Sequence, residues 1–236
     1  MLPSKLLLSL QSANELRFVQ GMSFPWLDLK NPAKGSLGCP EFRAASEFLD
    51  AFDRSFDRGQ CCLSMAVGEL RDEHWTELLP IAAGFDFVKV ALAGCLHDPK
   101  WETRATQLAT QLDSKEKLIL VHYADHQRAE APDWQATLDA AFSLGSQFLL
   151  IDTCHKYAGR LWDWYPNERI REFAKEANAK GIQLSIAGSL RLEELKKART
   201  LGAAVVGVRG AACLDSSRTL GLCRDRLMQL SKLFAE

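Results

Sequence analysis

The chain lacks several features that would assign it to a specialised class of protein. Its seven cysteines are odd in number and form no C-x-x-C pair, which argues against a disulfide framework or a zinc site. No apolar run approaches the roughly 20 residues that cross a membrane. Basic and acidic residues nearly cancel, 29 against 30, and form no long block of either sign. We therefore expect a reduced, cytosolic protein with no membrane or nucleic-acid partner.

Glycine is missing from one informative place. The first apolar run is followed by Ser9-Leu-Gln-Ser-Ala-Asn14, whereas an open sheet that binds a dinucleotide would carry a G-x-G-x-x-G turn there. Linkers, low-complexity tracts and shifts of composition are absent as well. With 47% hydrophobic and 25% charged residues, the 236 residues are expected to form a single domain over 1–236.

What the sequence does contain is one unit repeated eight times: a short apolar run, a small or polar turn and a helical stretch. The sixth helix, for example, places Ile170, Phe173, Ala174 and Ala177 on one face before Gly181. This alternation predicts a parallel sheet covered by helices, and eight units favour a closed (β/α)₈ TIM barrel over an open doubly wound sheet. The expected strands are Lys5–Leu10, Trp26–Lys30, Gln60–Val67, Phe85–Ala91, Leu118–Tyr123, Gln147–Asp152, Ile182–Ala187 and Ala204–Arg209.

Charged residues occur near the C-terminal ends of the even-numbered strands. Asp28 and Lys30 are two positions apart in the second strand, so they share a face. Lys89, Asp152 and Arg209 lie late in the fourth, sixth and eighth strands. Any one of them could belong to a satisfied structural pair. Because burying unpaired charge is costly and barrel enzymes hold their chemistry at this end, the set of five predicts a functional site.

Two lysines that face one cavity have a specific chemical use. A lysine beside another cation in a poorly solvated pocket loses its proton more readily, and the free amine can attack an aldehyde or ketone to form a Schiff base. The second lysine and the carboxylates can then move protons during dehydration and carbon–carbon bond formation. Lys156, four residues after Asp152, could add a third cation or be a solvated loop lysine.

Two regions have the small residues typical of phosphate-binding loops. Gly35 and Ser36 lie in a turn before the helix that is expected to begin at Cys39, although these glycine-containing turns could also be only tight turns. Barrels often hold a phosphate in the loops after strands seven and eight. A sugar phosphate or triose phosphate is therefore the favoured small-molecule substrate. The candidates in the second region are Gly188, Ser189, Arg209, Gly210 and Ala211.

The histidines are less informative. His122, at the end of the fifth strand, could be an acid or base or a hydrogen-bonded structural residue. His155 has no second histidine at metal-ligand spacing, so no metal is expected.

The stretch 28–38, DLKNPAKGSLG, resembles a long motif of the (5-formylfuran-3-yl)methyl phosphate synthases, also called 4-(hydroxymethyl)-2-furancarboxaldehyde-phosphate synthases. Stretches 87–94, 152–156, 184–190 and 206–212 match the same family in the same order. The resemblance implies a TIM barrel that condenses two molecules of glyceraldehyde 3-phosphate into the furan aldehyde phosphate, releasing phosphate and water. That product supplies the furan of methanofuran, a carrier of one-carbon units, and the mechanism needs no cofactor.

By the same resemblance, Lys30 forms the Schiff base and Lys89 accepts a proton. Asp28, Asp152 and Lys156 match the supporting charged residues of the family's site. Two other functions stay open: a class I aldolase acting on another sugar phosphate, and a non-catalytic barrel that binds sugar phosphates. Assembly into a homo-oligomer stays open as well.

Overall fold

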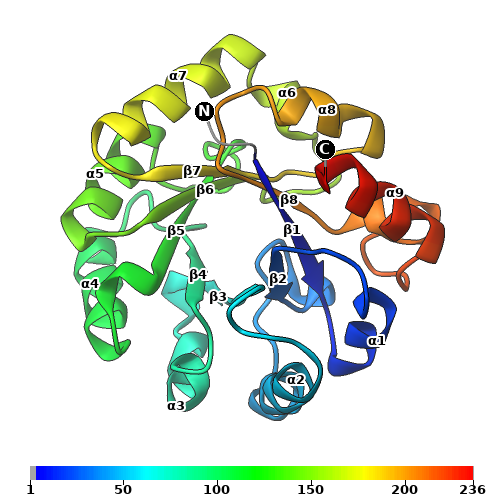
Figure 1. Cartoon of the computed structure of the whole chain (residues 1–236). Helices are drawn as coiled ribbons and strands as arrows, with labels where there is room; N and C mark the ends of the chain where they lie inside the picture. Colours follow the sequence, from blue (N-terminus) through cyan, green and yellow to red (C-terminus); the bar gives the residue numbers. More distant parts are fainter. Residues whose placement is uncertain (1–3, 236) are drawn as a thin grey trace.

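Eight parallel strands close into a barrel in chain order, because each strand pairs with the next and β8 pairs with β1. The structure, a computed structural model, describes residues 4–235, so residues 1–3 and 236 of the expected domain lie outside it. Figure 1 looks into the barrel, with the helices arranged around it. The predicted TIM barrel is confirmed. Its strands are β1 (Lys5–Leu10), β2 (Trp26–Leu29), β3 (Cys62–Glu69), β4 (Phe87–Ala91), β5 (Leu118–Tyr123), β6 (Phe148–Asp152), β7 (Gln183–Ile186) and β8 (Val205–Val208).

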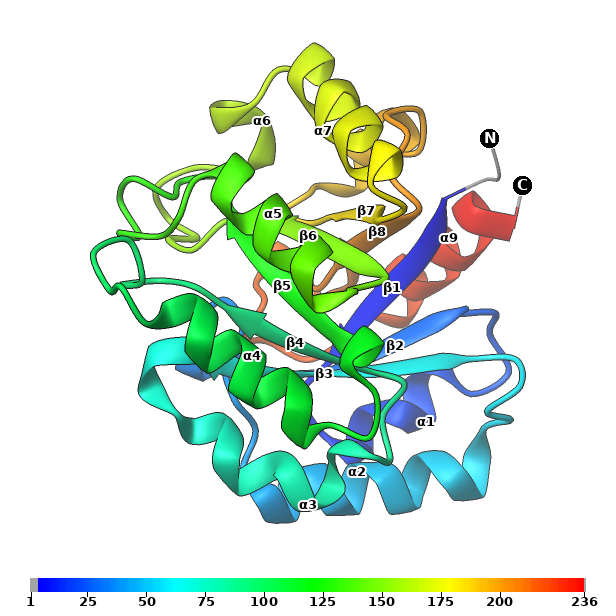
Figure 2. The ribbon, with the colours of Figure 1, turned by 90° about the vertical axis from the view of Figure 1, so that its left-hand side faces the viewer.

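The helices cover the outside of the barrel, as the side view shows (Figure 2). In α7 the four apolar residues of the predicted face, from Ile170 to Ala177, are buried, and Gly181 adopts a φ of 75° just beyond the helix end. No helix in the described range combines the length and apolarity of a membrane span. The α-helices are α1 (Leu16–Val19), α2 (Phe42–Ser55), α3 (Leu79–Ala82), α4 (Trp101–Gln111), α5 (Trp134–Leu144), α6 (Leu161–Trp164), α7 (Asn167–Ala179), α8 (Leu195–Ala198) and α9 (Arg224–Ala235).

Several strand ends differ from the prediction by one or two residues. β2 ends at Leu29, so Lys30 is the first residue after it, although the Lys30 N–H still donates to the carbonyl oxygen of Leu10 at 3.0 Å. β3 is displaced by two residues at both ends, and its pairing with β4 is irregular between Ala66 and Glu69. Such shifts are usual because strand ends fray. They leave the predicted charges at the C-terminal mouth.

Alternate strands fill the barrel interior in layers. Trp26, Phe87 and Phe148 begin β2, β4 and β6, and their ring centroids lie 5.1 Å apart in each pair. These three rings form an aromatic floor near the N-terminal ends of the strands. Asp28 and Lys89 each follow a floor residue by two positions, so they occupy the next layer. Since the floor fills one end of the barrel with apolar rings, the charged layer opens only toward the C-terminal mouth.

Candidate active site

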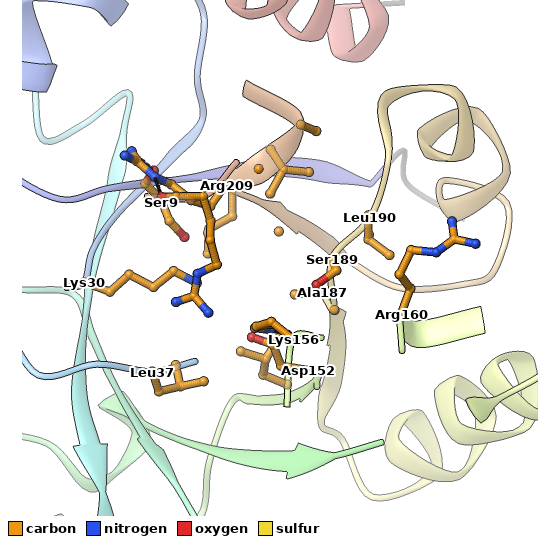
Figure 3. A pocket seen from close by; sticks show the side chains of 18 of the residues that line it. Ser9, Lys30, Leu37, Asp152, Lys156, Arg160, Ala187, Ser189, Leu190 and Arg209 are labelled. Carbon is orange, nitrogen blue, oxygen red and sulfur yellow. Dashed lines mark hydrogen bonds and ion pairs between the residues drawn. The ribbon is translucent and has the colours of Figure 1, made fainter. Parts of the chain in front are cut away.

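A cavity of about 370 Å³ lies at the C-terminal mouth of the barrel. Lys30, Lys89, Asp152 and Lys156 line it, together with the loops that follow β7 and β8. Figure 3 shows Lys30, Asp152 and Lys156 converging on this space, with Ser189 at its far side. The structure thus brings together residues that are far apart in the sequence.

Lys89 and Asp28 form a buried ion pair at the bottom of the cavity. The Lys89 Nζ lies 2.6 Å from Asp28 Oδ1, and the two side chains are 4% and 0% exposed. The hydroxyls of Ser64 and Ser9 donate to the two Asp28 oxygens at 2.7 and 3.0 Å. Trp26 Nε1 in turn donates to the Ser64 oxygen at 2.9 Å, which connects this pair to the aromatic floor. The Asp28 carboxylate is therefore held on both oxygens and fixes the position of the Lys89 amine.

Lys156 and Asp152 form a second buried pair. Their Nζ and Oδ1 atoms are 2.5 Å apart, and the Lys156 side chain is only 12% exposed, which removes the alternative of a solvated loop lysine. Burial favours the neutral form of Asp152, but Lys156 and Lys30 outweigh it and hold the pKa of Asp152 below its usual value. Asp125 holds the loop, since it accepts the N–H groups of Cys154 and His155.

Lys30 differs from the other two lysines because its amine has no partner. Among residues 4–235, no side chain or carbonyl forms a hydrogen bond or ion pair with the Lys30 Nζ, yet the residue is only 8% exposed and lines the cavity. Burial lowers the pKa of Lys30 from 10.5 to about 7, with Lys156 and Lys89 acting in the same direction and Asp152 and Asp28 opposing them. A large fraction of this amine is therefore unprotonated near neutral pH.

The loops after β7 and β8 supply backbone N–H groups to the cavity. Gly188, Ser189, Gly210 and Ala211 all line it, and within the described chain none of their N–H groups has an acceptor. Gly188 has a φ of 112°, and a Cβ there would lie 3.2 Å from the side chains of Leu161 and Thr153, so the position requires glycine. These free N–H groups at the cavity wall are of the kind that can bind an anion.

The turn containing Gly35 and Ser36 departs from the expected phosphate loop. Gly35 is exposed, and neither residue lines the cavity. The buried Ser36 hydroxyl lies 2.8 Å from the Thr153 carbonyl oxygen and 3.2 Å from Asp152 Oδ2. Asn31 N–H closes the turn by donating to the Gly38 carbonyl at 2.8 Å. Ser36 thus supports Asp152 from behind instead of facing a ligand.

Arg209 also departs from its expected role as a phosphate ligand. It is buried, and its guanidinium forms a bidentate pair with Glu15 at 2.6 and 2.9 Å. Its remaining N–H groups donate to the carbonyl oxygens of Ser9, Arg218 and Leu220. All five donors of this guanidinium are occupied by the protein, so none is left for phosphate.

The histidines lie outside the cavity lining. His122 points out of the barrel toward the helices, where its Nε2 lies 3.0 Å from the Tyr165 hydroxyl and its ring contacts Trp134 and Phe173. Burial lowers the pKa of His122 to about 3, so the ring is neutral. His155 pairs with Asp125 at 3.0 Å. No group of three His, Cys, Asp or Glu side chains suited to a metal occurs within residues 4–235.

Sequence reasoning missed three residues that the structure brings to the site. Ser9 and Ser64 hold Asp28, and the strand register could have revealed them, because both are Cα partners of Asp28 on the neighbouring strands. Arg218 lines the cavity from the irregular loop after β8, where no periodic pattern indicates which way a side chain points.

Comparison with known proteins identifies the family. Residues 6–231 match the profile of the 4-HFC-P synthase family. The (5-formylfuran-3-yl)methyl phosphate synthase of Methanopyrus kandleri is 30% identical over 214 residues, which cover 86% of each chain. The enzyme of the same name from Methanobrevibacter smithii is 30% identical over 202 residues, which cover 83% of each chain. The solved 3-hexulose-6-phosphate synthase from Salmonella typhimurium, 16% identical, covers 98% of both chains with a TM-score of 0.63, which shows a shared fold. This chain belongs to the 4-HFC-P synthase family.

Proposed function

We propose that this protein is a lyase that condenses two molecules of glyceraldehyde 3-phosphate into (5-formylfuran-3-yl)methyl phosphate, with release of phosphate and water. The observation that carries the proposal is the Lys30 amine, which is unpaired, faces the cavity and has a pKa of about 7. The names of the family members support the product. The furan would serve a methanofuran-type carrier of one-carbon units.

Lys30 is the nucleophile in this proposal. Its amine attacks the aldehyde carbon of one triose phosphate, and loss of water gives an iminium. The iminium draws electrons from the neighbouring carbon, so that carbon loses a proton more readily and no cofactor is needed as an electron sink. Lys89, held by Asp28, moves protons during dehydration, and the Asp152–Lys156 pair supplies charge on the opposite side of the cavity.

One substrate phosphate is expected at the loops after β7 and β8. The free N–H groups of Gly188, Ser189, Gly210 and Ala211 can donate to phosphate oxygens. Their position at the barrel mouth is where many barrels bind phosphate.

Incubation with glyceraldehyde 3-phosphate tests the proposed reaction. A furan aldehyde absorbs strongly in the ultraviolet, whereas the product of an ordinary aldolase does not. We expect growth of this absorbance, release of inorganic phosphate and the mass of the furan aldehyde phosphate. A phosphorylated product without the absorbance would point to an aldolase, and binding without turnover to a non-catalytic barrel.

The reactivity of Lys30 is expected to rise with pH through about 7 and then level off. The free amine is the nucleophile, and its fraction increases as the pH passes the lowered pKa. The rate of Lys30 methylation by formaldehyde and cyanoborohydride, followed by peptide mass spectrometry, measures this without interference from the substrate phosphate. A midpoint near 10, as for an exposed lysine, would contradict the assignment.

We also propose that the protein works in the cytosol. All seven of its cysteines are free in the structure, which agrees with a reducing compartment.

A further inference from the structure

Arg218 is a cation of the cavity that forms no ion pair with a carboxylate among residues 4–235. The cavity arginines Arg209 and Arg160 are paired with Glu15 and Glu194. Arg218 instead donates one N–H to the carbonyl oxygen of Gly35, and its other N–H groups find no acceptor in the described chain. Because it is partly buried, its charge is incompletely solvated and would gain from an anion.

The loop after β8 holds Arg218 in place. Nε of the buried Arg209 donates to the Arg218 carbonyl oxygen at 3.0 Å, and its Nη2 donates to that of Leu220 at 3.2 Å. Arg226 fixes the same loop through the Ser216 hydroxyl at 2.8 Å. Arg209, the arginine predicted to bind phosphate, thus positions the backbone of Arg218. The Arg218 guanidinium is the one that is free to bind a phosphate.

The contact with Gly35 places the Arg218 guanidinium over the β2 side of the mouth. Gly35 follows β2, whereas Gly188 and Ser189 follow β7, and β1 and β8 separate those two strands in the barrel. Lys30, directly after β2, lies on the same side as Gly35. The cavity therefore has two places for an anion, the backbone cradle after β7 and β8 and the Arg218 guanidinium on the β2 side of the mouth.

We propose that Arg218 anchors a second phosphate subsite, which holds the phosphate of the second triose phosphate while the first is bound to Lys30. This rests on the proposed function, because a reaction between two phosphorylated molecules in one cavity needs two anion sites. A guanidinium suits the task, since its planar N–H groups match two phosphate oxygens. It also gives a basis for selecting a phosphorylated second substrate over free glyceraldehyde.

Arg218→Met is the direct test, with Arg218→Lys and Arg191→Met beside it. Arg191 is a matched control, because it lines the cavity without a carboxylate partner but is exposed on the β7 side. For Arg218→Met we expect a rise of about 30-fold or more in the KM for furan formation. Borohydride trapping of the first substrate on Lys30 should stay within about twofold of wild type. Arg218→Lys should recover part of the loss, and Arg191→Met should change KM less than about threefold.

Titration with inorganic phosphate makes the test independent of turnover. We expect two phosphate sites in the wild-type protein and one in Arg218→Met. The proposal is overturned if both variants at Arg218 keep the wild-type KM, or if Arg191→Met raises the KM more than Arg218→Met does. It is also overturned if Schiff-base trapping on Lys30 falls in parallel with furan formation, or if the wild-type protein binds a single phosphate. A wild-type protein that makes no furan yet shows the loss of one phosphate site in Arg218→Met would contradict the proposed reaction and leave the subsite standing.

Discussion

Replacing Lys30 with methionine is expected to reduce furan formation by at least about 10⁴-fold, because the proposed reaction has no other route to the iminium. The cavity's other lysines do not substitute for it. Lys89 and Lys156 are each bound by a carboxylate, at 2.6 and 2.5 Å, so neither amine is free to attack a carbonyl carbon. Steady-state rates from the growth of furan absorbance measure the effect. Retention of more than about 1% of wild-type activity would contradict the role given to Lys30.

The stability of the same variant provides the control for misfolding. Methionine removes a poorly solvated cation and keeps the volume, so Lys30→Met is expected to melt about 4 °C higher near neutral pH. In the folded protein the pKa of Lys30 is about 7, below its ordinary value of 10.5. Between these two pH values the unfolded wild-type chain binds more protons than the folded one. Wild-type stability therefore rises with pH over this range. The advantage of Lys30→Met should therefore be complete below about pH 7 and fade toward about pH 10.5. Calorimetry at both ends of this range measures it.

Removing one partner of the buried Lys89–Asp28 pair is expected to damage both stability and activity. In Lys89→Met, the Asp28 carboxylate stays buried with only two hydroxyls as donors. We expect a loss of about 3–5 kcal/mol in the free energy of unfolding, with a drop in Tm of about 10 °C. Because Lys89 also moves protons in the proposed reaction, the rate should fall by about 10²–10⁴-fold at a temperature where the variant is folded. Thermal unfolding and furan absorbance measure the two effects.

The double variant Asp28→Asn/Lys89→Met separates these effects. With both charges gone, stability should return to within about 1 kcal/mol of wild type, while activity stays low. The exposed pair Arg43–Glu47, with its atoms 2.9 Å apart, is the matched control, and Arg43→Met should cost less than about 1 kcal/mol. If Lys89→Met lost as little stability as Arg43→Met, or if the double variant regained activity, the Lys89–Asp28 pair would have a different role.

The barrel was predictable because its strands and helices obey simple periodicities. Charges two residues apart at the end of β2, or late on the other even strands, share the interior of a closed barrel, so Asp28, Lys30, Lys89 and Asp152 could be expected to meet. The aromatic floor of Trp26, Phe87 and Phe148 follows the same rule at the other end of these strands. The sequence indicates that these strand-initial residues are apolar, but not that their three rings meet.

The loops were less predictable, because their backbone follows no period. The glycines after β2 indicated a turn but not the direction in which Ser36 points. Arg209 lies at the mouth as expected, yet its partner Glu15 lies 194 residues away and no local pattern connects them. Arg218 is positioned by bonds to its own carbonyl oxygen, which side-chain patterns do not reveal.

The Schiff base on Lys30 is tested most directly by borohydride reduction in the presence of glyceraldehyde 3-phosphate, followed by peptide mass mapping. We expect a reduced triose phosphate attached to Lys30 and a loss of turnover in proportion to the labelling. Attachment to Lys89 or Lys156 instead, or an unmodified Lys30 in an enzyme that turns over fully, would contradict it.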